Sequence, residues 1–180
     1  MAEDHLSHNN YLKNRLKSIM KIFLVLFISA FLSVNVFAAG SDGGSSSSET
    51  SMYDEGVKIV KRAGKLEKKD KADKAKKLYS QAFKKFEKAY SKDKKNPDIL
   101  NYLGFTSRKS GNFTEAEDYY LKGLSLNPKH NGINEYLGEL YVQTNRMDKA
   151  NERLEILKAC NCKEYQELEL IIKTRGTKIY

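Results

Sequence analysis

Two consecutive segments of 34 residues, 97–130 and 131–164, share one pattern without a gap. The identical positions pair Ile99 with Ile133, Tyr102 with Tyr136, Leu103 with Leu137, Gly104 with Gly138, Ala116 with Ala150, Asn127 with Asn161, and Lys129 with Lys163. A period of this length is typical of a unit of two helices that stacks on copies of itself. Because each unit can bury its apolar face only against a neighbour, the sequence predicts an all-α solenoid.

Signals inside the first segment place its two helices. Gly111 followed by Asn112 predicts the end of one helix and a turn. Pro128 ends the second helix, because proline cannot continue it. Small residues at Gly104 and Ala116 let the two helices approach closely. The large side chains expected to fill the adjoining space are Tyr102, Leu103, Tyr120, Leu124 and Leu126.

The repeat resembles the tetratricopeptide repeat (TPR). That family's motif contains Leu-Gly, a Tyr, a small Ala, an aromatic residue four positions later and a closing Pro. The first segment matches it at Leu103, Gly104, Ala116, Tyr120 and Pro128, and has Leu100 and Ser107 in place of an aromatic residue and the Tyr. The second matches it at Leu137, Gly138, Tyr141 and Ala150, and departs from it at Asn134, Leu154 and Cys162. The resemblance implies stacked helix pairs that bind another protein.

A less regular repeat precedes these two, and a helix follows them. Residues 78–91 have the pattern of a second helix, with small and aromatic residues 34 positions before their equivalents. We expect its partner at 52–63, a break near Gly64, and a second helix that runs from about residue 68 to 91. After the last repeat, residues 164–173 form an apolar stripe that suits a capping helix.

The beginning of the sequence has the order of a secretory signal peptide. Basic residues precede an uncharged apolar run, Ile22 to Ala38, that ends in a small residue. We expect cleavage between Ala38 and Ala39, and export, to the periplasm in a bacterium. The alternative is an uncleaved membrane anchor, since 17 residues span roughly 25 Å of helix. The predicted organisation is a signal peptide at 1–38, a Gly/Ser-rich linker at 39–51, a basic first repeat at 52–96, TPR units at 97–130 and 131–164, and a cap and tail at 165–180.

Positive charge is concentrated in the first repeat. Residues 55–96 contain 16 Lys and Arg against six Asp and Glu, whereas residues 97–180 contain 12 of each. One interpretation is a solvated helix surface. The other is a patch that binds an anionic surface such as lipid head groups or an acidic protein. The signal peptide and the absence of any nucleic-acid-binding motif disfavour nucleic acid as the partner.

The resemblance also implies which residues face a ligand in a concave groove. The corresponding positions are Asn101, Phe105, Arg108, Lys109, Glu135, Glu139, Val142 and Gln143. An exposed Phe105 beside two cations would suit an extended peptide with apolar and acidic groups. In the alternative, Phe105 packs against the neighbouring repeat. A clamp for a terminal carboxylate is not expected, because Glu135 and Glu139 would repel it.

Cys160 and Cys162 flank one residue after the last repeat helix. They could pack beneath the cap, form a local disulfide in an oxidising compartment, or act as a redox or metal pair. Together with Glu164 and Tyr165 they resemble the ending of some small exported bacterial TPR proteins of uncharacterised function.

Motifs of catalysis are missing from the sequence. It has no phosphate-binding loop, no H-E-x-x-H and no set of Ser, His and Asp that stands out. We therefore expect no enzyme, no cofactor and no metal. The predicted function is an exported scaffold or assembly factor that binds a protein or peptide. The alternative is an adaptor tethered to a membrane by residues 22–38, by the Lys-rich helix at 58–95, or by both.

Overall fold

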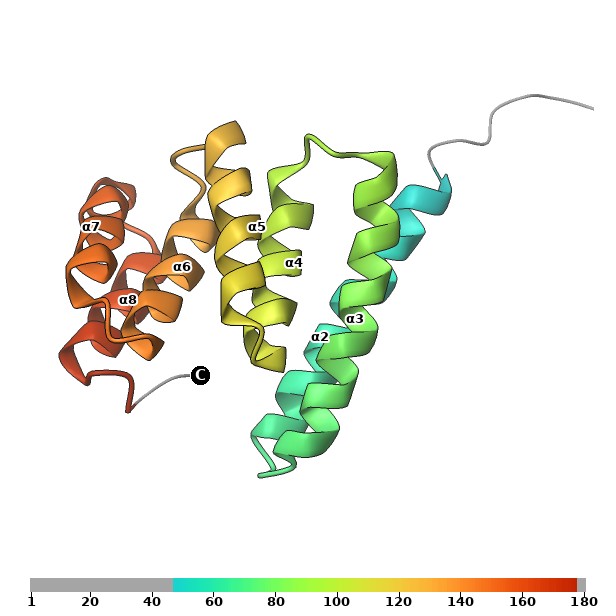
Figure 1. Cartoon of the computed structure of the whole chain (residues 1–180), viewed down its shortest axis with the longest axis horizontal. Coiled ribbons are helices and arrows are strands. Elements are labelled where there is room, and N and C mark those ends of the chain that lie inside the picture. Colours follow the sequence, from blue (N-terminus) through green and yellow to red (C-terminus); the bar gives the residue numbers. More distant parts are fainter. Residues whose placement is uncertain (1–46, 178–180) are drawn as a thin grey trace, which may run out of the picture. The chain divides into compact units, whose positions relative to one another are not determined.

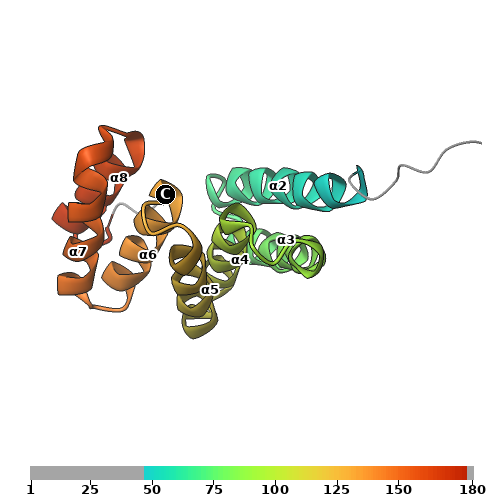
Figure 2. The ribbon, with the colours of Figure 1, turned by 90° about the horizontal axis from the view of Figure 1, so that it is seen from above.

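The computed structural model describes residues 47–177, with side chains from residue 52 onward, and consists of α-helices in antiparallel pairs (Figure 1). The helices are α2 (Ser47–Glu67), α3 (Ala72–Lys92), α4 (Pro97–Ser110), α5 (Phe113–Leu126), α6 (Asn131–Gln143), α7 (Met147–Leu157) and α8 (Lys163–Lys173). A 3-10 turn, η1 (Lys158–Cys160), follows α7. Seen from above, α5 lies on one side of this fold and α2 and α8 lie on the other (Figure 2). The all-α prediction is thus confirmed for the described residues.

Each of the first two helix pairs closes around a glycine that faces an aromatic ring. A Cβ atom at Gly104 would lie 2.4 Å from the Tyr120 ring, and one at Gly56 would lie 2.6 Å from the Phe86 ring. Both distances are far below van der Waals contact, so only glycine fits at either place. The two rings are completely buried, and this contact sets the distance between the helices.

The C-terminal end of α4 follows the sequence signal at Gly111, and the structure shows a side-chain cap at its other end. The Asn96 side chain accepts hydrogen bonds from the backbone of Asp98 and Ile99, and Pro97 occupies the first helical turn. The helix ends at Gly111, which has a φ of 90° in the left-handed region that favours glycine.

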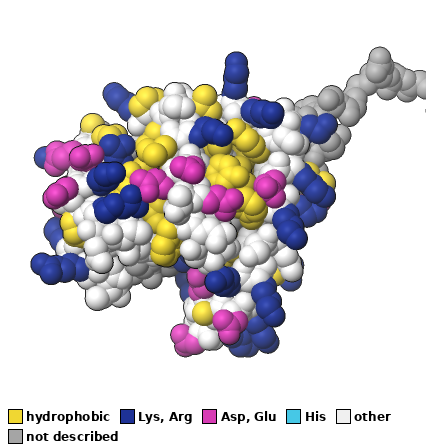
Figure 3. Space-filling view, in the orientation of Figure 1, with side chains coloured by type: hydrophobic (Ala, Val, Ile, Leu, Met, Phe, Trp, Pro, Cys, Tyr) yellow, Lys and Arg dark blue, Asp and Glu magenta, His cyan; other side chains and the backbone are white. Residues whose placement is uncertain are grey.

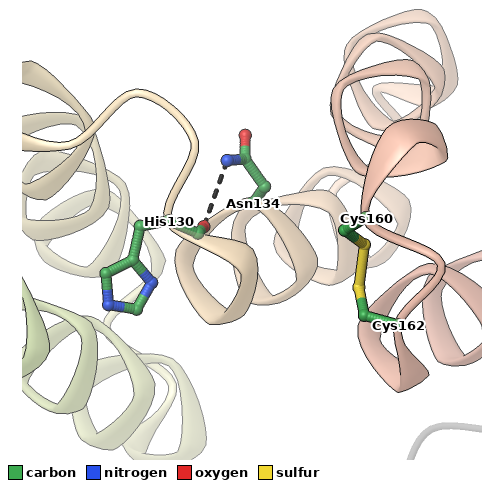
Figure 4. Close-up of a disulfide and its surroundings, with 4 residues drawn as sticks. All are labelled: His130, Asn134, Cys160 and Cys162. Carbon is green, nitrogen blue, oxygen red and sulfur yellow. Dashed lines mark hydrogen bonds between the residues drawn. A yellow bond between two sulfur atoms is a disulfide. The ribbon is translucent and has the colours of Figure 1, made fainter.

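A histidine caps α6. Nδ1 of His130 accepts the backbone N–H of Ile133, and Nε2 lies 3.0 Å from a carboxylate oxygen of Asp98 on α4. Asn134 on the next turn donates to the carbonyl oxygens of His130 and Pro128 (Figure 4). Asn134 is fully buried where the first repeat has Leu100, and these bonds satisfy its amide nitrogen.

The first helix pair differs from its predicted form. Gly64 does not break the chain but lies inside α2, and the turn comes later, at residues 68–71. The helix also begins at Ser47, so it includes the last five residues of the predicted linker. Both helices are 21 residues long, because Ala63 and Ala75 pack with Tyr79 and extend the apolar contact beyond Gly64. The Lys-rich extension is therefore a packed pair, not a single projecting helix.

The cap is present and starts earlier than predicted. It begins at Lys163, two residues inside the predicted second unit. Leu168 and Ile171 of α8 are fully buried, and a Cβ at Gly138 would lie 2.5 Å from Leu168. The cap therefore packs closely against Gly138 of the second unit. Another expectation was wrong: Leu126 is 43% exposed, because it lies at the end of α5 where no neighbouring helix covers it.

The predicted signal peptide, its cleavage site at Ala38 and Ala39, and residues 39–46 of the linker lie outside the described residues. Among the helices of residues 47–177, none combines the length and apolar character that a membrane span requires.

Candidate functional site

A cavity of about 700 Å³ opens between the first helices of successive pairs and the cap. Helices α2, α3, α4, α6 and α8 all contribute to its lining. The lining includes Val60, Glu67, Tyr79, Phe105, Tyr136 and Glu167. A concave site of this size is typical of a ligand-binding cleft.

Three aromatic side chains, Tyr79, Phe105 and Tyr136, form what we call the aromatic cluster. The ring centre of Phe105 lies 5.7 Å from that of Tyr79, in an edge-to-face arrangement, and 5.0 Å from that of Tyr136. Phe105 and Tyr136 are half-buried, so part of each ring remains open to the cavity. The cluster therefore offers an apolar surface on which a partner's side chain can pack. Phe105 contacts rings of the neighbouring pairs, as in the alternative, and it also lines the cavity, whereas its contact with a ligand stays a prediction.

Arg108 does not face the cavity as the groove pattern implied. It is only 3% exposed, and its guanidinium lies 2.6 Å from a carboxylate oxygen of Glu139 and 3.3 Å from the amide oxygen of Gln143. Desolvation works against its charge, but Glu139 and nearby tyrosine hydroxyls raise the pKa of Arg108 overall. Burial raises the pKa of Glu139, while Arg108 and Lys109 oppose that rise. Because a guanidinium stays protonated, the pair is ionic and holds α4 to α6.

Lys109 connects α4 to the first helix pair. Its ammonium lies 3.0 Å from a carboxylate oxygen of Glu67, which also accepts a hydrogen bond of 2.8 Å from the Tyr79 hydroxyl. Burial, and then this hydrogen bond, raise the pKa of Tyr79 above its ordinary range. The extended tip of α2 is thus fastened to α4 at the rim of the cavity.

The opposite side of the cavity consists of Glu135 and Glu139 of α6 and Glu167 of α8, which we call the acidic wall. Glu135 is 4% exposed. Burial raises its pKa to about 9, and both the charge of Glu139 and a hydrogen bond to Glu167 act in the same direction. At neutral pH Glu135 therefore carries a proton, which it shares in a hydrogen bond with Glu167.

The predicted groove residues fall into two groups. Phe105, Lys109, Glu135 and Glu139 line the cavity. Asn101, Arg108 and Val142 are buried between helices, and Gln143 is occupied by Arg108. The hydrogen bond from Arg108 to Gln143 joins α4 to α6, and a repeat pattern alone does not specify such a contact.

Other lining residues were not foreseen. Tyr136 occupies the position of Tyr102, which the pattern assigned to packing. Glu67 comes from the extension of the first pair, for which the repeat has no equivalent position, and Tyr79 lies just after the extension, 34 positions before Phe113. Glu167 lies on the cap, where the only available signal was its place four residues after Lys163, with which it pairs.

Cys160 and Cys162 form a disulfide between η1 and α8 (Figure 4). Asn161 between them has a φ of 48°, so the chain reverses within this small ring. The bond lies at the start of the helix that supplies Lys163 and Glu167 to the cavity. Among the described residues, no group of three or more His, Cys, Asp or Glu side chains is arranged to hold a metal ion.

Comparison with known families identifies the central pair. Residues 97–130 match the tetratricopeptide repeat. The chain contains a TPR. The match covers α4, α5 and the turns around them, which are the pair that the sequence motif fits best. A search of curated protein sequences finds no match.

Solved TPR-containing chaperones have a similar fold. The Yersinia enterocolitica type III secretion chaperone SycD, in complex with a peptide of the translocator YopD, superposes with a TM-score of 0.52 and 18% identity over 75% of this chain and 94% of SycD. The CopN–Scc3 complex gives 0.52 and 19% over 84% of each chain. PcrH, in complex with the chaperone binding region of PopD, gives 0.50 and 16% over 76% of this chain and 94% of PcrH. At these identities the similarity establishes the fold alone.

Proposed function

We propose that this chain is a non-enzymatic binding protein, a scaffold or assembly factor, that holds an extended segment of a partner protein in the cavity. The observation that carries the proposal is the aromatic cluster, in which Phe105 and Tyr136 are half-buried, within a concave site of about 700 Å³. Aromatic side chains in a partly enclosed pocket are the usual anchors of protein recognition.

The similar solved chaperones support this proposal because they bind segments of other proteins. SycD was solved with a peptide of YopD, and PcrH with the chaperone binding region of PopD. Both bind a segment of another protein on a fold like this one. The chemistry of the partner that this chain binds is inferred from its own cavity and not from the cavities of these relatives.

The test is capture of a partner by crosslinking, compared between two alanine variants. Phe105→Ala removes the central ring of the aromatic cluster, whereas Leu121→Ala removes an apolar side chain on α5 that is 47% exposed and does not line the cavity. We expect Phe105→Ala to reduce capture about tenfold and Leu121→Ala to leave it unchanged, with both variants melting cooperatively. Equal capture by the two variants would place the binding surface elsewhere.

We propose that the protein acts outside the cytoplasm, in the periplasm of a bacterium. The support is the order of basic, apolar and small residues at 1–38. The intact mass of the native protein provides the test: a chain that starts at Ala39 supports export with cleavage. A mass that includes residues 22–38 supports the alternative, a tethered adaptor.

A second candidate function is attachment to an anionic surface through the first helix pair. Lys and Arg side chains gather along the α2–α3 hairpin (Figure 3), where residues 55–96 have an excess of ten positive charges, 16 against six. Sedimentation with vesicles of phosphatidylglycerol and phosphatidylcholine would test it. Binding that is absent on pure phosphatidylcholine and is lost at high salt supports this function, and equal binding to both vesicles excludes it.

A further inference from the structure

The charges that line the cavity have the opposite sign to the outer surface of the first helix pair. Five carboxylate residues contribute to the lining, against three lysines. They are Glu67, Asp70, Glu135, Glu139 and Glu167, against Lys68, Lys109 and Lys163. A partner drawn to the basic exterior would be acidic, but the interior of the cavity disfavours an acidic group.

Existing ion pairs already use two of these lysines. Lys109 pairs with Glu67, and Lys163 pairs with Glu167. Lys68, the third, is exposed in the turn after α2. On the acidic side, Glu139 is paired with the buried Arg108 behind it. The interior therefore has little positive charge left to receive an anion.

Glu135 is the exception in this arrangement. It is almost fully buried, yet in the described part of the chain no Lys, Arg or His lies within ion-pair distance of its carboxyl group. A proton takes the place of a cation, because Glu135 hydrogen-bonds to Glu167. The groups that act on it are Glu139 from its own helix and Glu164 and Glu167 from α8, while Lys163 is held by Glu167.

A cation that entered the cavity could replace this proton. The ammonium of a lysine or the guanidinium of an arginine can donate to two carboxylates at once, and the displaced proton would pass to solvent. The cost of burying the new charge is offset because Glu135 is already buried and only 25% of the Glu167 side chain is exposed. The aromatic cluster lies in the same cavity, so an apolar side chain next to the cation would have its own surface.

We infer that the cavity binds a segment of the partner in which an aromatic or large aliphatic side chain is followed closely by a lysine or arginine, the apolar group on the aromatic cluster and the cation on the acidic wall. This inference rests on the proposed function and specifies its ligand. It departs from the acidic peptide that the sequence suggested, because Arg108, one of the two cations expected to attract it, is buried in an ion pair.

An array of synthetic 12-residue peptides tests the inference with the full-length protein. Each peptide has a Phe in a varied background of Gly, Ser, Ala and Leu. The residue one, two or three positions after the Phe is Lys, Arg, Gln or Glu, so that each background provides its own neutral control. We expect the Lys and Arg peptides to bind about tenfold more strongly than their Gln counterparts, and the Glu peptides to bind least. This order runs against the basic exterior, so non-specific attraction cannot produce it.

Two variants connect the preference to the acidic wall. Glu135→Gln keeps the size of the side chain and a hydrogen bond to Glu167 but cannot become anionic. We expect it to fold, by circular dichroism, and to bind Lys and Gln peptides equally. Glu155→Gln, on an exposed part of α7, is the matched control and should keep the full preference.

Each contrary outcome identifies what has failed. Stronger binding of Glu peptides, or a Lys preference that survives in Glu135→Gln, overturns the inference. So does an array on which no peptide binds. The proposed function is judged separately, because capture of the native partner that depends on Phe105 would stand in each of these cases, and its loss would remove the proposed function instead.

Discussion

The first helix pair and the TPR pair use the same contact but differ in length. In the TPR pair, Gly104 and Tyr120 are 16 residues apart, and in the first pair, Gly56 and Phe86 are 30 residues apart. The 14 additional residues lie at the tip: five in α2, two in the turn and seven in α3. Seven residues make about two helical turns, so α3 is lengthened without rotating the face that carries Phe86.

This difference creates the cavity. In the first pair, residues 63–78 stand where the TPR pair has only its two-residue turn, and they include Gly64, Glu67, Lys68, Asp70 and Ala72 of the cavity lining. The repeat alone would give a shallow surface along α4 and α6. The extension adds a side to it, which Lys109 and Glu67 hold in place. A change in length at one end of the solenoid has thus added a side to the cavity.

We expect the largest loss of stability at the contact between a glycine and an aromatic ring, which both helix pairs have. Gly104→Leu would force a side chain into the Tyr120 ring, with the Cβ alone 2.4 Å away. We expect a loss of about 4 kcal/mol or more and no cooperative thermal transition. A cooperative melt in this variant would mean that the helices do not cross as described.

The control variant changes Gly64, in the extension that only the first helix pair has. A Cβ at Gly64 would have only the Tyr79 hydroxyl near it, at 3.9 Å. Since alanine favours a helix interior over glycine by up to about 1 kcal/mol, Gly64→Ala should raise the melting temperature slightly. We therefore expect Gly104→Leu to destabilise the protein and Gly64→Ala to stabilise it.

Removing the extension should separate stability from binding. Replacing residues 63–78 by Gly-Asn, the turn found at Gly111 and Asn112, gives the first pair the spacing of the TPR pair. We expect a loss of about 3 kcal/mol, because Ala63 and Ala75 no longer bury their side chains with Tyr79. The chain should still melt cooperatively but should capture its partner poorly. Undiminished capture would show that the extension does not form part of the site.

The buried Glu135 of the cavity makes the free energy of unfolding depend on pH. Glu135 has a pKa of about 9 in the folded protein, against about 4.3 in an unfolded chain. Between these values the folded state binds the additional proton, so this residue lowers the free energy of unfolding as the pH rises. Glu135→Gln should therefore stabilise the protein by about 2 kcal/mol at pH 8 and not at pH 4. Denaturant unfolding at both pH values measures the effect, and a gain that does not grow with pH would contradict the assignment.

The smallest effect is expected at the far end of the fold. The disulfide between Cys160 and Cys162 closes a ring of three residues, and so small a ring restricts the unfolded chain by only about 1.5 kcal/mol. A variant with serine at both positions should lose no more than this and should keep its partner, because α8 is held by Leu168 and Ile171. A loss of several kcal/mol would show that the bond, and not this packing, holds the cap.

The sequence determined the helix pairs and the close contacts between the two helices of each pair. Gly104 and Ala116 recur as Gly138 and Ala150 after 34 positions, and local signals at Gly111 and Pro128 mark helix ends, so both could be read from residue types alone. The cap was predictable for the same reason, since its apolar stripe repeats at helical spacing. The excess of Lys and Arg in residues 55–96 was a matter of counting.

Only the tertiary structure decided where α2 ends and which charges meet. Gly64 has the local character of a helix end, but packing of the chain on both sides of it outweighs that preference. Arg108 and Glu139 are 31 positions apart, and Glu67 and Lys109 are 42 apart. Such pairs depend on the distance between helices, which a repeat period does not contain. The sequence thus determined how each pair folds, whereas the stacking of unequal pairs determined the cavity, because its side chains come from five helices that meet only in space.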